Sequence, residues 1–472
     1  MELTPAEKEL FAQVAKVADR LGQKVYVVGG FVRDRILKLP SKDIDFVTVG
    51  DGPFLAEQVA HELGRAASGL SIFKTFGTAM LRYQDFELEF VGARKESYVE
   101  HSRKPEVQTG TLEDDQLRRD FTINALAIHI QGDKLYQVID PFDGLQHLSE
   151  KKIITPLAPE QTFSDDPLRM MRAVRFASQL SFTIDDVTFE AIKSMHQRIG
   201  IVSMERVTYE LNKIILSRVP SVGIKLLEQS GLLGVLFPEM VLLKGVDLIA
   251  GHTHKDNFYH TLQVLDNISH YTDDLWLRWA AILHDIAKPQ TKRFEEGHAW
   301  TFHGQEALVE SMVPRIFIRM KLPLDDKMKY VQQLVRLHLR PIALVQEEIT
   351  DSAIRRLLYD AGHELDDLMI LCRADITSKN PDRVARYLRN YEVVMLKLKE
   401  VEEKDHLRNW QPPISGEIIM TTFGIPPGRE VGEIKTAIRE AILDGQLEND
   451  YDQAFHFMLA EGQRLGLAPR MS

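Results

Sequence analysis

The period of the hydrophobic pattern changes once along the chain, between residues 144 and 162. Before that point, short apolar runs predict strands, and residues 54–65 have the period of an amphipathic helix. The expected strands cover residues 24–28, 43–49, 78–83 and 85–91. After residue 162, almost every segment has a helical period. The pattern therefore predicts an α/β domain of about 140 residues followed by helical bundles.

Composition limits this picture further. A chain of 472 residues exceeds what one hydrophobic core usually supports, so we expect several domains. No apolar run reaches the ~18 residues that span a bilayer, and no secretory signal is recognisable. The single cysteine, Cys372, excludes an intrachain disulfide and favours a cytoplasmic location. A net charge of −11 means that RNA binding must come from a local basic patch.

A glycine pair followed by two aspartates indicates phosphate chemistry. Gly29 and Gly30 end the first expected strand, and Arg33 lies in the helix that follows. Backbone amides, the helix start and the guanidinium would attract a triphosphate. Asp43 and Asp45 are two residues apart on a strand, so their carboxylates share a face and attract Mg²⁺. The P-loop and dinucleotide-binding fingerprints are absent from the sequence.

A third carboxylate is expected from the segment Phe86-Glu87-Leu88-Glu89-Phe90. Its strict alternation places the apolar side chains in the core and both glutamates on the opposite face. One of them, for which we select Glu89, would complete a two-metal site. Such a site activates an RNA 3′-hydroxyl and stabilises the departing pyrophosphate.

Ordered motifs over the first part of the chain resemble class II tRNA nucleotidyltransferases and bacterial poly(A) polymerases. The motifs are Val28-Gly29-Gly30 with Arg33-Asp34, Asp43-x-Asp45, and the segments 118–126, 140–144 and 165–176. The resemblance implies an α+β protein: a nucleotidyltransferase α/β head with a mixed sheet, an all-α neck, an HD-type helical body and a helical tail. The expected boundaries are 1–150 for the head, 151–235 for the neck, 236–382 for the HD-type domain and 383–472 for the tail.

The same resemblance implies roles for individual residues. Gly30 and Arg33 would hold the nucleotide phosphates, and Asp43 and Asp45 would hold Mg²⁺. The nucleotide contacts implied beyond these are Arg119, Asp166, Arg169, Arg172 and Arg175. The family often has Glu-Asp where this chain has Asp165-Asp166.

Asp166 and Arg169 also suggest a way to select bases. Three residues apart on an expected helix, they would present a hydrogen-bond acceptor beside a forked donor. Cytosine and adenine both carry an exocyclic amine next to an unprotonated ring nitrogen, whereas guanine and uracil reverse that pattern. These two side chains would thus accept C and A without a template.

A histidine-rich block after residue 250 predicts a second metal site. His260, the pair His284-Asp285 and Asp375 follow the spacing of the HD phosphohydrolase superfamily, which they resemble. Imidazoles and carboxylates suit divalent transition metals, and Mn, Ni and Fe are the candidates here. The further candidates for binding phosphate or a second metal are His254, His303 and His338. The implied activity is hydrolysis of phosphomonoesters or 2′,3′-cyclic phosphodiesters; the alternative is an HD remnant that only packs helices.

Basic helices in the second half are candidates for RNA contact. Arg383, Arg386 and Arg389 recur at i+3 steps beside Tyr387 and Tyr391, which suits phosphate contact and base stacking. A solvated helix face explains the same pattern. The segment from residue 414 to 432 resembles the family's C-terminal tRNA-binding tail.

The function expected from these features is transfer of CMP and AMP from CTP and ATP to the tRNA 3′ end, completing CCA. A poly(A) polymerase is the alternative that shares the head and neck motifs, but its Gly-Arg-Arg-Phe cluster is replaced by FKTFGT at residues 73–78. Enzymes that add only CC or only A remain open alternatives. The segment 95–115 would switch the nucleotide specificity, and a sequence does not show how such a segment moves. An inactive RNA-binding protein is disfavoured by the intact Asp43 and Asp45. Expected partners are tRNA, ATP and CTP, with no membrane; the sequence gives no indication of oligomeric state.

Overall fold

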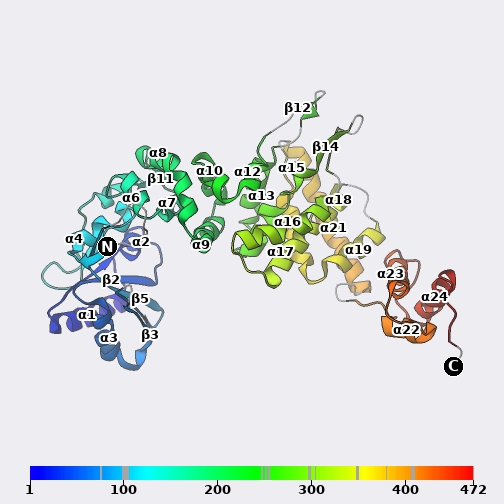
Figure 1. The fold of residues 1–472 in the computed structure, drawn as a ribbon, viewed down its shortest axis with the longest axis horizontal. Coiled ribbons are helices and arrows are strands. Elements are labelled where there is room, and N and C mark those ends of the chain that lie inside the picture. The colour runs from blue at the N-terminus through cyan, green and yellow to red at the C-terminus, as the bar shows by residue number, and fades with distance from the viewer. Residues whose placement is uncertain are drawn as a thin grey trace. The chain divides into compact units, whose positions relative to one another are not determined.

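The chain forms two compact units in a computed structural model, Met1–Val241 and Leu242–Ser472 (Figure 1). The described residues are 1–74, 77–97, 106–245, 248–249, 252–253, 256–295, 299–302, 305–346, 350–378, 380–405 and 410–470. A mixed sheet with helices near the N-terminus is followed by helical domains, which confirms the predicted fold class.

The head is built on a seven-stranded sheet in the order β3-β4-β5-β2-β1-β8-β9. Its strands are β1 (Lys24–Val28), β2 (Asp43–Val49), β3 (Ala67–Phe73), β4 (Thr78–Tyr83), β5 (Phe86–Gly92), β8 (Ala127–His129) and β9 (Val138–Ile139). β2 and β5 run parallel, and the other described pairs in this sheet are antiparallel. The strands predicted at residues 24–28, 43–49 and 78–83 form as expected, and the fourth begins one residue later.

Aromatic packing fixes which face of the sheet is the core. Helices α1 (Pro5–Arg20) and α3 (Gly52–Leu63) pack together beside the sheet. Phe11 of α1 meets Phe46 of β2 edge-on at 5.9 Å, and Phe46 stacks on Phe90 of β5 at 4.9 Å. Because side chains alternate along a strand, the acidic residues of β2 and β5 project from the opposite face.

The rest of the first unit is mainly helical, apart from two short strand pairs: β6 (Arg94–Ser97) with β7 (Glu106–Thr109), and β10 (Lys152–Ile153) with β11 (Thr183–Ile184). Its helices are α6 (Pro159–Asp165), α7 (Leu168–Leu180), α8 (Asp186–Met195), α9 (Met204–Ile215), α10 (Pro220–Gln229), α11 (Leu232–Leu236) and α12 (Pro238–Val241). α7 is the central helix, since both α9 and α10 pack on it. A Cβ at Gly223 of α10 would lie 2.4 Å from the Ile214 side chain, so glycine permits this close approach.

The second unit is a helical domain with a helical C-terminal segment. Its helices are α13 (Asn257–Ile268), α14 (Leu275–Leu283), α15 (Lys288–Thr291), α16 (Gln305–Arg319), α17 (Asp326–Leu337), α18 (Leu339–Gln346), α19 (Asp351–Ala361), α20 (Leu365–Asp375), α21 (Pro381–Asp405), α22 (Gly416–Phe423), α23 (Arg429–Leu443) and α24 (Tyr451–Arg464). Two short hairpins interrupt the helical pattern: β12 (Leu248–Ile249) with β13 (His252–Thr253), and β14 (Lys292–Glu295) with β15 (Ala299–Phe302). These four strands span two to four residues each, which is too short for a reliable period.

None of the helices in the described part of the chain combines the length and the hydropathy needed to cross a membrane. Cys372 is buried on α20, and burial raises the pKa of its thiol well above the ordinary value. This agrees with a packing role for that side chain.

Candidate functional site

Three carboxylates meet on one face of the head sheet. The parallel register of β2 and β5 places Asp45 beside Glu89 and Asp43 beside Glu87. Glu87 is exposed and forms an ion pair with Arg82 of β4 at 3.1 Å. Glu89 is half-buried next to Asp45, so it is the better candidate for the third carboxylate.

The electrostatics of this carboxylate group fit a divalent cation. Burial raises the pKa of Asp45; Arg119 opposes the shift, and Asp115 and Asp43 add to it. Burial and the charge of Asp45 likewise raise the pKa of Glu89. Clustered carboxylates whose ionised forms are unfavourable gain most from a nearby cation. The oxygen donors also match the preference of Mg²⁺.

The glycine pair lies directly against this acidic group. Gly29 has a φ of 89°, and a Cβ there would lie 2.6 Å from Arg119 Nη1 and 3.5 Å from Asp45 Oδ2. Only glycine fits this conformation and this approach without strain. The Gly29 amide donates to the Leu126 carbonyl at 2.8 Å, so it does not serve as a phosphate donor here. Gly30 begins helix α2 (Gly30–Ile36), whose N-terminus adjoins the carboxylates.

Arg33 and Arg119, the two head arginines expected to contact the nucleotide, are held by neighbouring polar groups. Arg33 is buried and donates to Asn124 Oδ1 at 2.6 Å and to Asp34 Oδ1 at 2.8 Å. Arg119 Nε donates to the buried carboxylate of Asp115 at 3.1 Å. These contacts fix both guanidinium groups beside the glycine turn.

Asp120 joins the head to the neck. The buried Asp120 accepts hydrogen bonds from the Asn124 side chain at 3.0 Å and from Arg172 Nε of α7 at 2.6 Å. Burial alone would raise its pKa, but Arg172, Asn124 and Arg169 together lower the pKa to about 2. The sequence motif at residues 118–126 contains Asp120, but it does not indicate the contact with Arg172. That contact follows only from the position of α7 in the structure.

We expect Asp120→Asn to reduce the free energy of unfolding by about 2 kcal/mol at pH 7, because the folded state favours the ionised carboxyl. A depressed pKa stabilises above the unfolded value and loses that contribution as pH falls. The difference between wild type and variant should therefore shrink from about pH 4 to about pH 2. Urea unfolding across this range measures it, with the exposed Asp133→Asn as control. A difference that does not change with pH would contradict the ion-pair explanation.

The structure corrects the prediction that Asp166 and Arg169 share a helix. Asp166 is an extended residue at the end of α6, and Pro167 separates it from the first turn of α7. A residue before proline is disfavoured in the helical conformation, which explains the break. Asp166 Oδ2 pairs with Arg206 of α9 at 3.0 Å, and Arg169 Nη2 donates to the Arg118 carbonyl at 2.6 Å.

The remaining arginines of α7 surround one aromatic ring. Arg172 and Arg175 lie over the Phe176 ring at 5.4 and 4.1 Å, and Arg33 lies over it at 4.9 Å. Arg175 is buried and pairs with Glu210 of α9 at 2.5 Å. In this conformation Arg175 therefore ties α7 to α9. No sequence motif had indicated that Glu210 would pair with Arg175.

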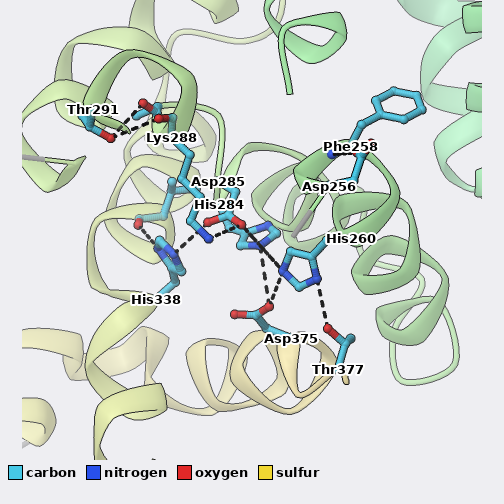
Figure 2. A network of polar contacts seen from close by, with 12 residues as sticks. Asp256, Phe258, His260, His284, Asp285, Lys288, Thr291, His338, Asp375 and Thr377 are labelled. Carbon is cyan, nitrogen blue, oxygen red and sulfur yellow. Dashed lines mark hydrogen bonds and ion pairs between the residues drawn. The ribbon is translucent and has the colours of Figure 1, made fainter. Parts of the chain in front are cut away.

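The second unit contains a compact His/Asp cluster (Figure 2). His260 Nε2 lies 3.4 Å from His284 Nε2 and 3.6 Å from Asp285 Oδ2. His284 Nε2 lies 3.3 Å from the same oxygen, and Asp375 Oδ1 lies 2.8 Å from His260 Nε2. Two atoms bound to one ion at ~2.1 Å stand roughly 3 to 3.6 Å apart. His260, His284 and Asp285 are thus spaced as ligands of a single metal ion.

Buried polar atoms in this cluster lack hydrogen-bond partners. They are Asp285 Oδ1 and His338 Nε2, which stand 3.8 Å apart. Leaving such atoms unpaired is costly, and a bound ion or phosphate would satisfy them. The other oxygen, Asp285 Oδ2, accepts from Lys288 Nζ at 2.7 Å. His254 and His303 lie outside the described residues.

The ring nitrogens that face away from the cluster are fixed by neighbours. Thr377 Oγ1 lies 3.0 Å from His260 Nδ1, and the Ala281 carbonyl accepts from His284 Nδ1 at 2.7 Å. Such contacts hold the imidazoles with Nε2 turned inward, as metal ligands require. Although burial would raise it, His260 and His284 hold the pKa of Asp375 to about 2.

The basic helix α21 differs in part from expectation. Tyr387 is close to Arg383 and Arg386, whose guanidinium groups lie 5.6 and 5.2 Å from its ring. Tyr391 is buried, with Arg373 over its ring at 5.7 Å, so it does not present a stacking surface. The sequence placed both tyrosines beside the arginines, but packing takes the Tyr391 ring into the core.

Three parts of the chain match known domain families. Residues 25–154 match the poly(A) polymerase head domain, and residues 181–243 match the probable RNA and SrmB-binding site of polymerase A. Residues 257–379 match the HD domain. The sheet with its acidic face and the His/Asp cluster thus define a nucleotidyltransferase head linked to an HD domain.

Relatives of similar length extend the match. An A-adding tRNA nucleotidyltransferase of Deinococcus radiodurans is 34% identical over 350 residues, which cover 71% of this chain and 76% of the relative. The CCA-adding enzyme of Enterococcus faecalis is 27% identical over 461 residues, 97% of each chain. A CCA-adding enzyme structure from Bacillus stearothermophilus, in complex with CTP, has the same fold, with a TM-score of 0.66 at 20% identity over 98% of this chain and 99% of that one. The chain belongs to the tRNA nucleotidyltransferase and poly(A) polymerase family, as its motifs predicted.

Proposed function

We propose that this chain completes the CCA end of tRNA by transferring CMP and AMP from CTP and ATP. The observation that supports the chemistry is the group formed by Asp43, Asp45 and Glu89 beside the glycine turn. The Enterococcus relative, which matches over 97% of both chains, is named a CCA-adding enzyme. We assign catalysis to residues 1–150, base recognition to 151–235, a second metal site to 236–382 and RNA binding to 383–472. A cytoplasmic location agrees with a tRNA substrate.

The head residues divide the work of the transfer. Asp43 and Asp45 would hold Mg²⁺, with Glu89 completing the carboxylate set. When bound, Mg²⁺ activates the RNA 3′-hydroxyl and neutralises charge on the departing pyrophosphate. Arg33 and Arg119 are fixed beside Gly29 and Gly30, so they can orient the triphosphate without reorganising.

Base selection is assigned to Asp166 and Arg169. Although they do not share a helix, both lie at the junction of α6 and α7, and the Arg169 amide donates to the Asp166 carbonyl at 3.0 Å. A carboxylate oxygen would accept the exocyclic amine of C or A, and the guanidinium would donate to the ring nitrogen. Arg169 uses Nη1 and Nη2 for carbonyls of Thr162 and Arg118, which sets its orientation.

Incubation with tRNA that lacks its 3′ end, each NTP alone and in pairs, and Mg²⁺ tests the assignment. Addition of C, C and A that then stops is the expected product. Long A tails would instead identify a poly(A) polymerase. No product from correctly folded protein would identify an RNA-binding protein without transferase activity.

Addition of A alone is a second candidate function. The 34% identical relative from Deinococcus radiodurans is named an A-adding enzyme. Comparing tRNA that ends before CCA with tRNA that already ends in CC separates the two programmes. An A-adding enzyme extends only the second substrate, and a CC-adding enzyme extends only the first, by two nucleotides.

We expect Arg169→Ala to lower the preference for CTP over UTP about ten- to a hundredfold, because one good base contact contributes about 1–3 kcal/mol of discrimination. The ratio of kcat/KM for the two nucleotides measures it. Mg²⁺ dependence should stay as in wild type, since Arg169 is not among the charged neighbours that shift the pKa of Asp45 or Glu89. An unchanged nucleotide preference would contradict the role of this side chain.

For the second unit we propose a metal-dependent phosphohydrolase that acts on phosphomonoesters or 2′,3′-cyclic phosphodiesters, such as damaged RNA ends. The ligand spacing of His260, His284 and Asp285 supports it, as does the position of Asp285 Oδ1, 3.8 Å from His338 Nε2 inside the cluster. Mn, Ni and Fe are the candidate metals, because imidazole and carboxylate together suit them. Asp375 is assigned as the fourth ligand and His338 as a contact to phosphate.

A further inference from the structure

Asp166 is held by groups from two different helices. Its Oδ1 accepts a hydrogen bond from the backbone amide of Leu168, at the start of α7, at 3.1 Å. Its Oδ2 accepts from Arg206 Nη2, in the first turn of α9, at 3.0 Å. The hydrogen bond from α7 to Oδ1 and the one from α9 to Oδ2 together fix the orientation of the carboxylate plane. No sequence motif pointed to Arg206.

A second ion pair one helical turn further along fixes α9 against α7. Glu210 lies four residues after Arg206, on the same face of α9, and pairs with Arg175 of α7 at 2.5 Å. That pair is buried, with side-chain exposures of 10% and 3%. The Arg206–Asp166 pair is more open, at 46% and 23%. The buried pair thus sets the position of α9, and the Arg206–Asp166 pair is accessible to solvent.

We infer that Arg206 is a positioning residue for nucleotide selection: it orients the Asp166 carboxylate toward the exocyclic amine of cytosine or adenine. This inference rests on the proposed function, because it takes Asp166 as the acceptor for that amine. A carboxylate has about four acceptor sites, so Oδ2 can bind Arg206 and a base amine together. Without Arg206, Oδ2 would lose this contact, and the carboxylate could turn more freely about its Cβ–Cγ bond.

The test compares Arg206→Ala with wild type by measuring KM and kcat for all four nucleotides on tRNA substrates. An exposed ion pair contributes up to about 1 kcal/mol, so the KM for CTP and ATP should rise about two- to fivefold with kcat nearly unchanged. The KM for UTP and GTP should stay within about twofold, which lowers the selectivity for the correct nucleotides. Arg206→Lys should recover part of the loss, and Lys213→Ala, on the same helix, is the matched control.

Two outcomes would overturn the inference. An equal rise in KM for all four nucleotides would assign Arg206 to phosphate attraction, and unchanged constants would leave it without a role in selection. Asp166→Ala distinguishes failure of this inference from failure of the proposed function. If Asp166→Ala relaxes selectivity and Arg206→Ala does not, only the positioning role is wrong; if neither does, base selection by Asp166 is wrong as well.

Discussion

Asp45→Asn is expected to reduce nucleotide addition about a thousandfold, since metal-assisted stabilisation of the transferred phosphate contributes several kcal/mol. Asn keeps the size of the side chain but offers one neutral oxygen in place of a carboxylate. Because burial disfavours the charged form of Asp45, the variant should fold with a Tm equal to or above that of wild type. Single-turnover addition to tRNA and calorimetry measure the two effects.

The glutamate pair on β5 supplies a matched control for this experiment. Glu89→Gln should follow Asp45→Asn with a large loss of kcat, because Glu89 lies beside Asp45. Glu87→Gln should leave activity near the wild-type value, because Glu87 pairs with Arg82 at the surface. If the Glu87 variant loses activity and the Glu89 variant keeps it, the third carboxylate has been assigned to the wrong residue.

Replacing His284 and Asp285 together should abolish metal binding in the second unit. Loss of one residue that hydrogen-bonds to a metal ligand weakens metal affinity by about 10- to 100-fold. Removal of two ligands themselves should therefore weaken the affinity by more than about a hundredfold. The double variant His284→Gln, Asp285→Asn preserves side-chain size in a fully buried cluster. Metal analysis after dialysis against Mn²⁺ or Ni²⁺ gives the stoichiometry, and hydrolysis of a 2′,3′-cyclic nucleotide gives the activity.

The two sites should respond independently to this variant. Metal binding and hydrolysis fall, and CCA addition stays at the wild-type rate. The control is the pair His456→Gln, Asp452→Asn on α24, where both residues are exposed. A parallel loss of addition and hydrolysis by a folded variant would contradict the assignment of two sites. Metal retention by the double variant would show that the cluster is not the binding site.

Local patterns were sufficient for four strands of the head sheet (β1, β2, β4 and β5) and for the order of the domains, but they did not predict β3, β8 and β9. Strict alternation in β5 placed Phe90 in the core and Glu89 on the other face, and the structure agrees. Side chains of a strand alternate between the two faces of the sheet, so a run of five alternating residues assigns each side chain to one face. The four-position HD pattern was equally informative, because ligands of one metal must converge and the structure brings His260, His284 and Asp285 together.

Contacts between distant segments were beyond such patterns. The period around residue 166 suggested a continuous helix, yet Pro167 divides it into α6 and α7. No sequence motif indicates the roles of Asp120, Arg206 and Glu210. Each of them acts through a partner more than thirty residues away along the chain. Their importance follows only from the packing of α7 against the head and against α9.

The buried Asp120–Arg172 contact, together with the Arg118 carbonyl that accepts from Arg169, has a consequence for protein engineering. A chimaera that takes its first 150 residues from this chain and its neck from a relative would separate these partners. A junction after α9, which ends at Ile215, keeps these contacts and the Arg175–Glu210 and Asp166–Arg206 pairs within one parent. The unit that keeps these contacts when it is exchanged is therefore the head with α7 to α9 attached.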